Sequence, residues 1–455
     1  MIKIDTALTP AALKPKLVKL FELAGKKIRL IEKTWDKNRG TPVFTMAGKY
    51  TSRGWTEWTQ GFLYGNALLA FDATGDKELL ELGKNHTLND MAPHLSHIGV
   101  HDHGFNNVST YGNILRLMKE GKIPENAWEK NFLELALKLS GAAQGSRFTE
   151  LPEGLGYIRS FNGPHSLFAD TIRSVRSLML GHKLGHILMG EKDRKISLLG
   201  RSLQHAETTA RFNVYFGEGR DAYDMRGRVV HESIFNLTDG SYRCPSSQQG
   251  YSPFTTWTRG LAWILLGFAE ECEFIESLPE AKVNEELKAL GFPYYKDKAS
   301  VLKRFSETAK ATADFYLEQT PVDGIPYWDT GAPELHKLGD YLARPAEPFN
   351  DHEPVDSSAA AISAQGLLRL GKFLNEKKYT QAGLTVANTL FDTPYLSTDD
   401  SHQGLILHSI YHRPNGWDFV PPGKKIPSGE SSLWGDYHAI ELALYLKRQA
   451  ENGAY

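Results

Sequence analysis

Four imidazole or carboxylate side chains fall within seven residues of the stretch HIGVHDHGFNN: His97, His101, Asp102 and His103. A carboxylic acid can move protons to and from a substrate, and imidazoles beside a carboxylate can hold zinc or iron. One interpretation is therefore acid–base catalysis by Asp102, and another is a metal-dependent hydrolase that uses His101, Asp102 and His103. A third is structural, because the segment resembles a loop entering a helix near Phe105, which Asp102 would cap.

A second carboxylate, Asp170, stands in the stretch FADTIRSVRSLML. The spacing of Phe168, Ile172, Val175 and Met179 predicts a helix whose first turn contains this acid. In that position Asp170 could simply complement the helix dipole. If Asp170 instead shares a cavity with another acid, burial can keep one carboxyl protonated while the other is ionised, as acid–base chemistry requires.

The stretch SSQQGYSPFTTWTRGLAWILLGF, residues 246–268, places two Trp, an Arg and a Gln pair around a predicted helix start. Helical spacing accounts for Trp257, Leu261 and Ile264 as core residues. Gln249 and Arg259 have no such structural explanation.

Three further side chains are weaker candidates. His205 lies in LQHAETTARFNVYF, where a buried core histidine and a ligand-lining histidine are both open interpretations. His408 lies in GLILHSIYHRPNGWDF, and Trp434 opens another predicted helix in GESSLWGDYHAIELALYL.

Helices must position these side chains, because apolar residues recur at helical spacing along most of the chain. The pattern predicts an all-α fold with strand-like runs that are short, such as RVVHESIF. We expect a single domain, residues 1–455, built as an (α/α)6 toroid with two rings of helices. An α-solenoid is the alternative, but the sequence shows no repeat period. The twelve expected helices span about 11–36, 58–73, 76–92, 106–120, 125–141, 166–188, 193–213, 256–276, 299–318, 357–375, 378–393 and 432–448.

The long connections of such a toroid would build a pocket at one end. They are expected at roughly 142–165, 214–255 and 319–356, and the Trp- and Arg-rich stretch closes the second of them.

Composition narrows the class of ligand. Lys and Arg number 52 against 54 Asp and Glu, so the chain lacks the basic field that nucleic acid binding needs. Aromatic residues make up 11%, which suits a protein that stacks rings on carbohydrate. Cys244 and Cys272 are expected to be reduced thiols. No stretch is apolar enough for a membrane span, so we expect a cytoplasmic protein, or a periplasmic or secreted one if a leader has been removed.

Taken in order, the motifs resemble those of the unsaturated glucuronyl hydrolases, glycoside hydrolase family 88, and of the related unsaturated rhamnogalacturonyl hydrolases. WTQGFLYG is similar to the family's W-T-x-G-F-W-x-G, HDHGF to its H-D-L-G-F, and FADTIRSVRSLML to its helix bearing a second acid. QQGYSPFTTWTRGLAWILLG is similar to H-Q-G-Y followed by W-x-R-G-Q-A-W, and DSSAAAISAQGLLRL and WGDYHAIEL resemble the closing segments. The resemblance runs from Trp58 to Tyr437.

The resemblance implies an (α/α)6 barrel that hydrolyses lyase-generated oligosaccharides. Such an enzyme removes a 4,5-unsaturated uronic acid from the non-reducing end by hydrating its vinyl ether, with no cofactor and no metal. Asp170 matches the family's general acid/base and Asp102 its second catalytic aspartate. Arg259 is the candidate for a two-bond grip on the uronate. The substrate-binding residues that the resemblance implies are His205, Gln249, Trp257, Arg259, Trp263, Trp58 and His408.

Some positions depart from the family pattern. Leu63 replaces an aromatic residue, His103 replaces the Leu after Asp102, and Gln248 replaces the His before Gln249. The loop 214–247 is also longer than expected, so we expect the linkage and sulfation preference to differ. The partner is an unsaturated uronyl oligosaccharide, and the enzyme is expected to be a monomer or weak homo-oligomer. The alternative of a noncatalytic carbohydrate-binding toroid would require neither acid.

Overall fold

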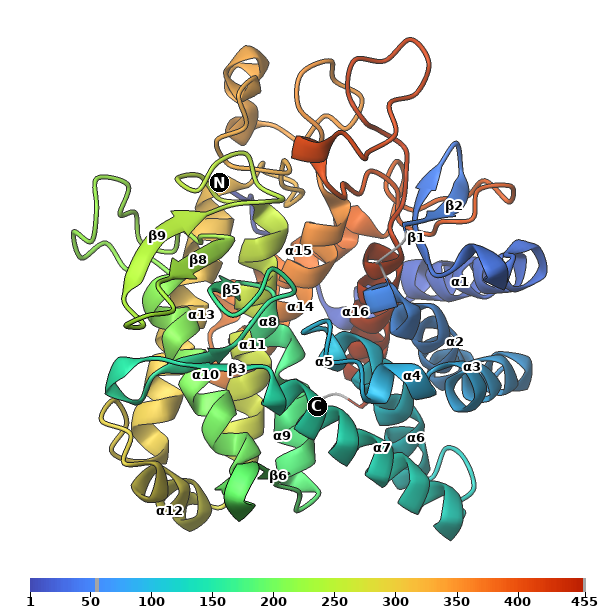
Figure 1. Ribbon diagram of the computed structural model, residues 1–455. Helices are drawn as coiled ribbons and strands as arrows, with labels where there is room; N and C mark the ends of the chain where they lie inside the picture. The colour runs from blue at the N-terminus through green and yellow to red at the C-terminus, as the bar shows by residue number, and fades with distance from the viewer. Residues whose placement is uncertain (54–56, 453–455) are drawn as a thin grey trace.

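The computed structural model describes residues 1–53 and 57–452, and within them six helical segments form a closed inner ring (Figure 1). Each segment contacts the next in chain order, and the last contacts the first. The ring consists of α2 (Gln60–Thr74); α5 (His103–Asn106), continued by a π-helical turn (Val108–Gly112) into α6 (Asn113–Lys119); α8 (Thr171–Ser174) with α9 (Arg176–Lys183); α11 (Thr258–Ser277); α14 (Ser357–Leu374); and α16 (Leu433–Asn452).

Six further helices form an outer layer around this ring. Each packs against the inner segment next to it in sequence. They are α1 (Lys14–Thr34), α3 (Lys77–Asp90), α7 (Ala127–Ser146), α10 (Leu198–Phe212), α13 (Lys298–Gln319) and α15 (Lys377–Leu390). The prediction of an (α/α)6 toroid is therefore confirmed. The predicted span 1–455 also includes residues 54–56 and 453–455, which lie outside the described residues.

Neighbouring inner helices can pack closely where a small residue lies at their point of contact. A Cβ on Gly366 of α14 would meet the Leu265 side chain of α11 at 2.8 Å. Glycine at this position therefore allows α11 and α14 to approach each other. Asp356 directly precedes α14 and caps it, because its carboxylate accepts hydrogen bonds from the backbone of Ser358 and Ala359.

Small antiparallel sheets lie between the helices. β1 (Pro42–Met46) pairs with β2 (Lys49–Ser52), β3 (Phe148–Glu150) with β4 (Gly156–Ile158), and β6 (Leu188–Met189) with β7 (Lys195–Ile196). A three-stranded sheet has the order β5 (Ser166–Phe168), β8 (Glu232–Phe235) and β9 (Tyr242–Ser246). The run RVVHESIF thus contributes a strand, as predicted.

Strands replace helical turns at several predicted helix boundaries. Residue 188 and residues 195–196 were expected in helices but lie in β6 and β7, so α9 (Arg176–Lys183) ends earlier and α10 (Leu198–Phe212) starts later than predicted. Residues 166–168 were expected to begin a helix but form β5, whose Leu167 lies opposite Ser233 of β8. The long connection before α11 supplies this partner strand, so pairing replaces the first helical turn and the helix starts at Thr171. Two shorter helices, α4 (Ala92–Leu95) and α12 (Glu280–Leu290), were not predicted. Over the described residues, no helix has the length and apolar character needed to cross a membrane.

Candidate active site

A cavity of about 100 Å³ lies at the N-terminal ends of the inner helices. Asp102 directly precedes α5, Asp170 precedes α8 and Trp257 precedes α11, so helix starts far apart in sequence meet at one end of the barrel. Seven of the nine predicted site residues line this cavity: Trp58, Asp102, Asp170, Gln249, Trp257, Arg259 and Trp263.

His101 lies between the two aspartates. Its Nε2 is 3.2 Å from Oδ1 of Asp170 and 3.8 Å from Oδ1 of Asp102. All three side chains are buried, with 9% or less of each residue exposed. The prediction that Asp102 and Asp170 approach each other in one cavity is therefore supported by the geometry.

Neither aspartate acts as a helix cap. Asp102 and Asp170 occupy the N-cap positions of α5 and α8, but neither side chain accepts a hydrogen bond from its own helix. The structural interpretation of Asp102 as a cap is therefore wrong. Both carboxylates are turned toward the cavity and His101 instead.

The environment drives the pKa values of the two carboxyls apart. Burial raises the pKa of Asp102 to about 6, and the charge of Asp170 adds to this while His101 opposes it. Burial also acts on Asp170, but the hydrogen bond and positive charge of His101 outweigh it and lower the pKa of Asp170. The same two carboxylates raise the pKa of His101 against the effect of burial. His101 and Asp170 therefore hold one proton between them, as in acid–base pairs with separated pKa values.

The adjacent His103 does not share this site. Its Nδ1 lies 3.0 Å from Ser140 Oγ, and its Nε2 lies 3.0 Å from the backbone oxygen of His97. Both ring nitrogens are therefore engaged away from Asp102. Across residues 1–53 and 57–452, no group of three or more His, Cys, Asp or Glu side chains is arranged to hold a metal ion. The H-x-H pair does not chelate as the metal interpretation requires.

Arg259 is 2% exposed, and its two terminal nitrogens are fully engaged. Nη1 donates to Asp356 Oδ2 at 2.7 Å and to the backbone oxygen of Ile410. Nη2 donates to Gln249 Oε1 at 2.8 Å and to the backbone oxygen of Tyr411 at 2.7 Å. Arg259 therefore has no terminal N–H pair left to form the expected two hydrogen bonds with a ligand carboxylate. Its guanidinium instead orients the Gln249 amide.

Aromatic side chains make the floor of the cavity. Trp58 stacks on Trp434 with ring centroids 5.2 Å apart, and Phe105 lies 4.9 Å from Trp263. Apolar rings exclude water and strengthen electrostatic interactions among the buried acids. Trp434, which opens α16, thus supports the site without being among the residues that line it.

Two predicted site residues lie outside the cavity lining. His205 is fully buried in α10, where its Nδ1 accepts a hydrogen bond from the Ile158 backbone at 3.1 Å. His408 accepts one from the Gly429 backbone at 3.1 Å, and its ring packs edge-on against Phe349. Burial lowers the pKa of both imidazoles, so both are neutral near pH 7.

Several residues that line the cavity or lie beside it were not predicted from the sequence. His231 packs 4.6 Å from Trp257, and its Nδ1 accepts hydrogen bonds from the backbone N–H groups of Gln248 and Gln249 at 3.0 and 3.3 Å. It lies in RVVHESIF, a run identified only as a strand. The segment that suggested His408 also contains Trp417, which lines the cavity. Other lining residues without a prediction are Val100, Phe161, Tyr411, His412 and Asn415.

Comparison with known proteins agrees with this arrangement. No protein-family model matches the chain. The unsaturated glucuronyl hydrolase of Formosa agariphila is 25% identical over 397 residues, which cover 86% of this chain and 80% of that protein. The unsaturated glucuronyl hydrolase of Bacillus sp. strain GL1 is 26% identical over 411 residues, which cover 88% of this chain and 89% of that protein.

Solved structures show the same fold. The crystal structure of unsaturated glucuronyl hydrolase from Bacillus sp. GL1 aligns with a TM-score of 0.70 over 97% of both chains, at 22% identity. An unsaturated glucuronyl hydrolase specific for heparin aligns with a TM-score of 0.72 over 96% of this chain and 98% of that chain, at 20% identity. Sequence similarity and fold thus agree along almost the whole length of the protein. The chain is a glycoside hydrolase whose sequence and fold are similar, along almost its whole length, to those of the unsaturated glucuronyl hydrolases, glycoside hydrolase family 88.

Proposed function

We propose that the protein removes a 4,5-unsaturated uronic acid from the non-reducing end of oligosaccharides produced by polysaccharide lyases. The observation that carries the proposal is the buried His101 between two carboxylates at 3.2 and 3.8 Å. Two relatives named unsaturated glucuronyl hydrolase support the substrate class. The whole chain acts as one catalytic domain without cofactor or metal, as a monomer or weak homo-oligomer.

The reaction is hydration of the vinyl ether. Asp170 passes the proton that it shares with His101 to C4 of the sugar, and the positive charge that develops at C5 is stabilised by the ring oxygen. Water adds at C5 and returns a proton to the Asp170–His101 pair, which restores the enzyme. The resulting hemiketal opens to a ketone, and the hemiacetal left at C1 releases the aglycone. One water is consumed, and the catalytic groups end as they began.

Asp102 and Gln249 hold the sugar during these steps. With its pKa of about 6, Asp102 is ionised in neutral solution and accepts hydrogen bonds from sugar hydroxyls. The Gln249 amide oxygen is occupied by Arg259, so its NH₂ group is the part that can bind the uronate carboxylate. Arg259 therefore acts through Gln249 and through its own charge rather than through a direct two-bond grip.

The size of the cavity supports action on a chain end. A small space of about 100 Å³ lined by aromatic rings suits a single terminal sugar unit better than the middle of a polysaccharide. The half-exposed Phe161 stands at the lining and stacks 6.2 Å from His101, where it can meet the next sugar.

The mechanism is tested in heavy water with an unsaturated disaccharide. Hydration places deuterium at C4 of the first-formed product, because the proton at that carbon comes from the enzyme. Attack at the anomeric carbon by two carboxylates leaves C4 without a new hydrogen. Early product NMR showing no deuterium at C4, together with a strict preference for one anomer, would overturn the proposal. Loss of the conjugated chromophore across lyase-generated disaccharides then identifies the preferred substrate.

A further inference from the structure

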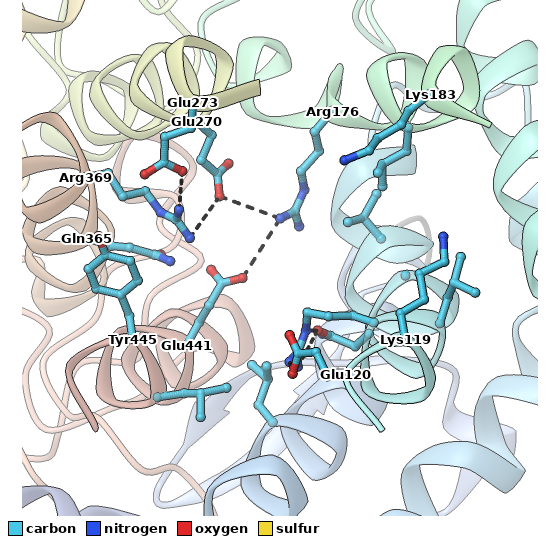
Figure 2. A pocket seen from close by; sticks show the side chains of 18 of the residues that line it. Lys119, Glu120, Arg176, Lys183, Glu270, Glu273, Gln365, Arg369, Glu441 and Tyr445 are labelled. Carbon is cyan, nitrogen blue, oxygen red and sulfur yellow. Dashed lines mark hydrogen bonds and ion pairs between the residues drawn. The ribbon is translucent and has the colours of Figure 1, made fainter. Parts of the chain in front are cut away.

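A second and larger cavity, of about 1040 Å³, lies at the opposite ends of the inner helices. The catalytic cavity is lined by Asp102, Asp170 and Arg259 at helix starts. This cavity is lined instead by residues near the C-terminal ends of inner helices, such as Lys183 of α9, Glu273 of α11 and Lys372 of α14. Its volume is at the upper end of the range for ligand-binding pockets. Figure 2 shows ionic side chains around the hollow.

Gln365 marks the cavity as a polar binding site. Its residue is fully buried, yet neither its amide nitrogen nor its amide oxygen has a hydrogen-bond partner in the part of the chain that the structure describes. Figure 2 shows this amide directed from α14 into the hollow. A buried amide without partners costs stability, so a ligand that both donates and accepts hydrogen bonds there would relieve that cost. A hydroxyl group has both capacities.

Arg176 makes the cavity favour an anionic ligand. The neighbouring Arg173 already binds both acids of this wall, at 2.9 Å to Glu270 and 2.8 Å to Glu441. The Nη1 of Arg176 is left 3.9 Å from each of these acids, beyond hydrogen-bond distance. Burial and the charge of Arg173 lower the pKa of Arg176, against the opposing charges of Glu270 and Glu441.

The cavity lining as a whole also has more basic side chains than acidic ones. The cavity is lined by seven basic side chains and five acidic ones. Lys183 is exposed at the end of α9 and projects toward the hollow from the side facing Gln365 (Figure 2). A lysine in the last turn also complements the helix dipole, so a purely structural role for Lys183 has to be separated from a binding role.

We propose that this cavity binds a small hydroxylated anion, a sugar carboxylate or sugar phosphate, with its anionic group at Arg176 and Lys183 and a hydroxyl on the Gln365 amide. The site is independent of the catalytic cavity and does not rest on the proposed reaction.

Calorimetric titration of the full chain tests this site, with D-glucuronate and glucose 6-phosphate as the two anionic probes and D-glucose as the uncharged control. We expect at least one anion to bind more tightly than glucose. Gln365→Leu should weaken that binding about tenfold, because a buried hydrogen-bond donor and acceptor are lost. Lys183→Ala should weaken it severalfold, whereas Lys288→Ala, an exposed lysine of α12 outside the cavity, should leave it unchanged.

The melting temperatures of the unliganded variants provide the control for folding. Gln365→Leu removes no hydrogen bond of the unliganded protein, so its melting temperature should not fall. If that variant fails to fold, Lys183→Ala alone decides the case. Binding that is lost in the catalytic-cavity variant Gln249→Leu but kept in Gln365→Leu and Lys183→Ala would overturn the proposal. So would the absence of binding by both anions, or a lower melting temperature of Lys183→Ala with unchanged affinity.

Discussion

Arg259 and Asp356, 97 residues apart in sequence, form a buried ion pair with Nη1 and Oδ2 2.7 Å apart. The pair ties the start of α11 to the start of α14 at the rim of the catalytic cavity. The same guanidinium holds the Gln249 amide at 2.8 Å, so the stability of the barrel and the shape of the site depend on one side chain.

Arg259→Lys should therefore affect both stability and binding. An ammonium keeps the charge but cannot reproduce four hydrogen bonds from a planar group, which leaves part of this network unsatisfied. We expect the free energy of unfolding to fall by about 2 kcal/mol and KM for the unsaturated uronide to rise more than kcat falls. Urea unfolding and steady-state kinetics measure the two effects. Lys303→Ala, which removes an exposed pair with Glu307 at 3.9 Å, is the control and should change neither.

Asp170→Asn should lower kcat at least about 10²-fold, because an amide keeps the shape of the carboxyl group but cannot pass a proton. Stability gives a second readout. The pKa of Asp170 is lowered in the folded protein, so this carboxylate stabilises the fold above its unfolded pKa and loses that effect as pH falls through the folded pKa. The variant should be less stable than the parent at pH 7, by a margin that shrinks in acid. Turnover close to that of the parent would move the acid role to another residue.

Asp102→Asn should have the opposite effect on stability. The pKa of Asp102 rises from 3.8 to about 6 on folding, so the folded parent loses stability as pH increases between these values. Asparagine carries no charge to bury, and the variant should be more stable than the parent at pH 7 by about 3 kcal/mol, a gain that vanishes below about pH 4. Thermal unfolding over this range measures the effect. An equal shift of both variants in one direction would contradict the opposed pKa values of the two acids.

The ionisation of Asp102 should also appear in the rate. If the carboxylate holds the sugar hydroxyls, kcat/KM rises with pH through about 6. The remaining activity of Asp102→Asn should not show this rise of kcat/KM with pH. A parent enzyme whose activity falls through pH 6 would mean that the protonated acid is the working form.

Glu271 of α11 is a structural cost that a single substitution can relieve. It is 2% exposed, and neither carboxyl oxygen has a hydrogen-bond partner within residues 1–53 and 57–452. Burial raises the pKa of Glu271 well above its usual value of 4.5, so its charge opposes folding as pH increases. Glu271→Gln should raise the melting temperature at pH 8 more than at pH 5, with activity unchanged. Glu307→Gln, at an exposed position of α13, is the matched control and should not show this pH dependence.

Local spacing in the sequence predicted the ring of helices because each inner and outer helix carries its own apolar pattern. It also predicted that Asp102 and Asp170 stand at helix starts, and a toroid brings such starts to one end. Partners far along the chain could not be predicted from spacing. The replacement of the first helical turn by β5 depends on β8, and the engagement of Arg259 depends on Asp356.

The electrostatics of the site were equally hidden in the sequence. His101 was considered as a metal ligand, but its role between two acids depends on distances that no spacing contains. His231 lies beside Trp257 and the Gln pair because β8 pairs with β5, next to Asp170. A histidine in the long connection before the Gln pair is the signal that would have found it.

The inner ring cannot close until α16 takes its place between α14 and α2. This helix supplies Trp434 beneath Trp58, and its Asp436 binds Tyr50 at 2.7 Å, so it joins segments separated by hundreds of residues. During translation the catalytic floor is therefore assembled only after residues 433–452 have left the ribosome. Until then the growing chain exposes the apolar edges of α2 and α14, and such exposed apolar surface makes a partly folded chain prone to aggregation.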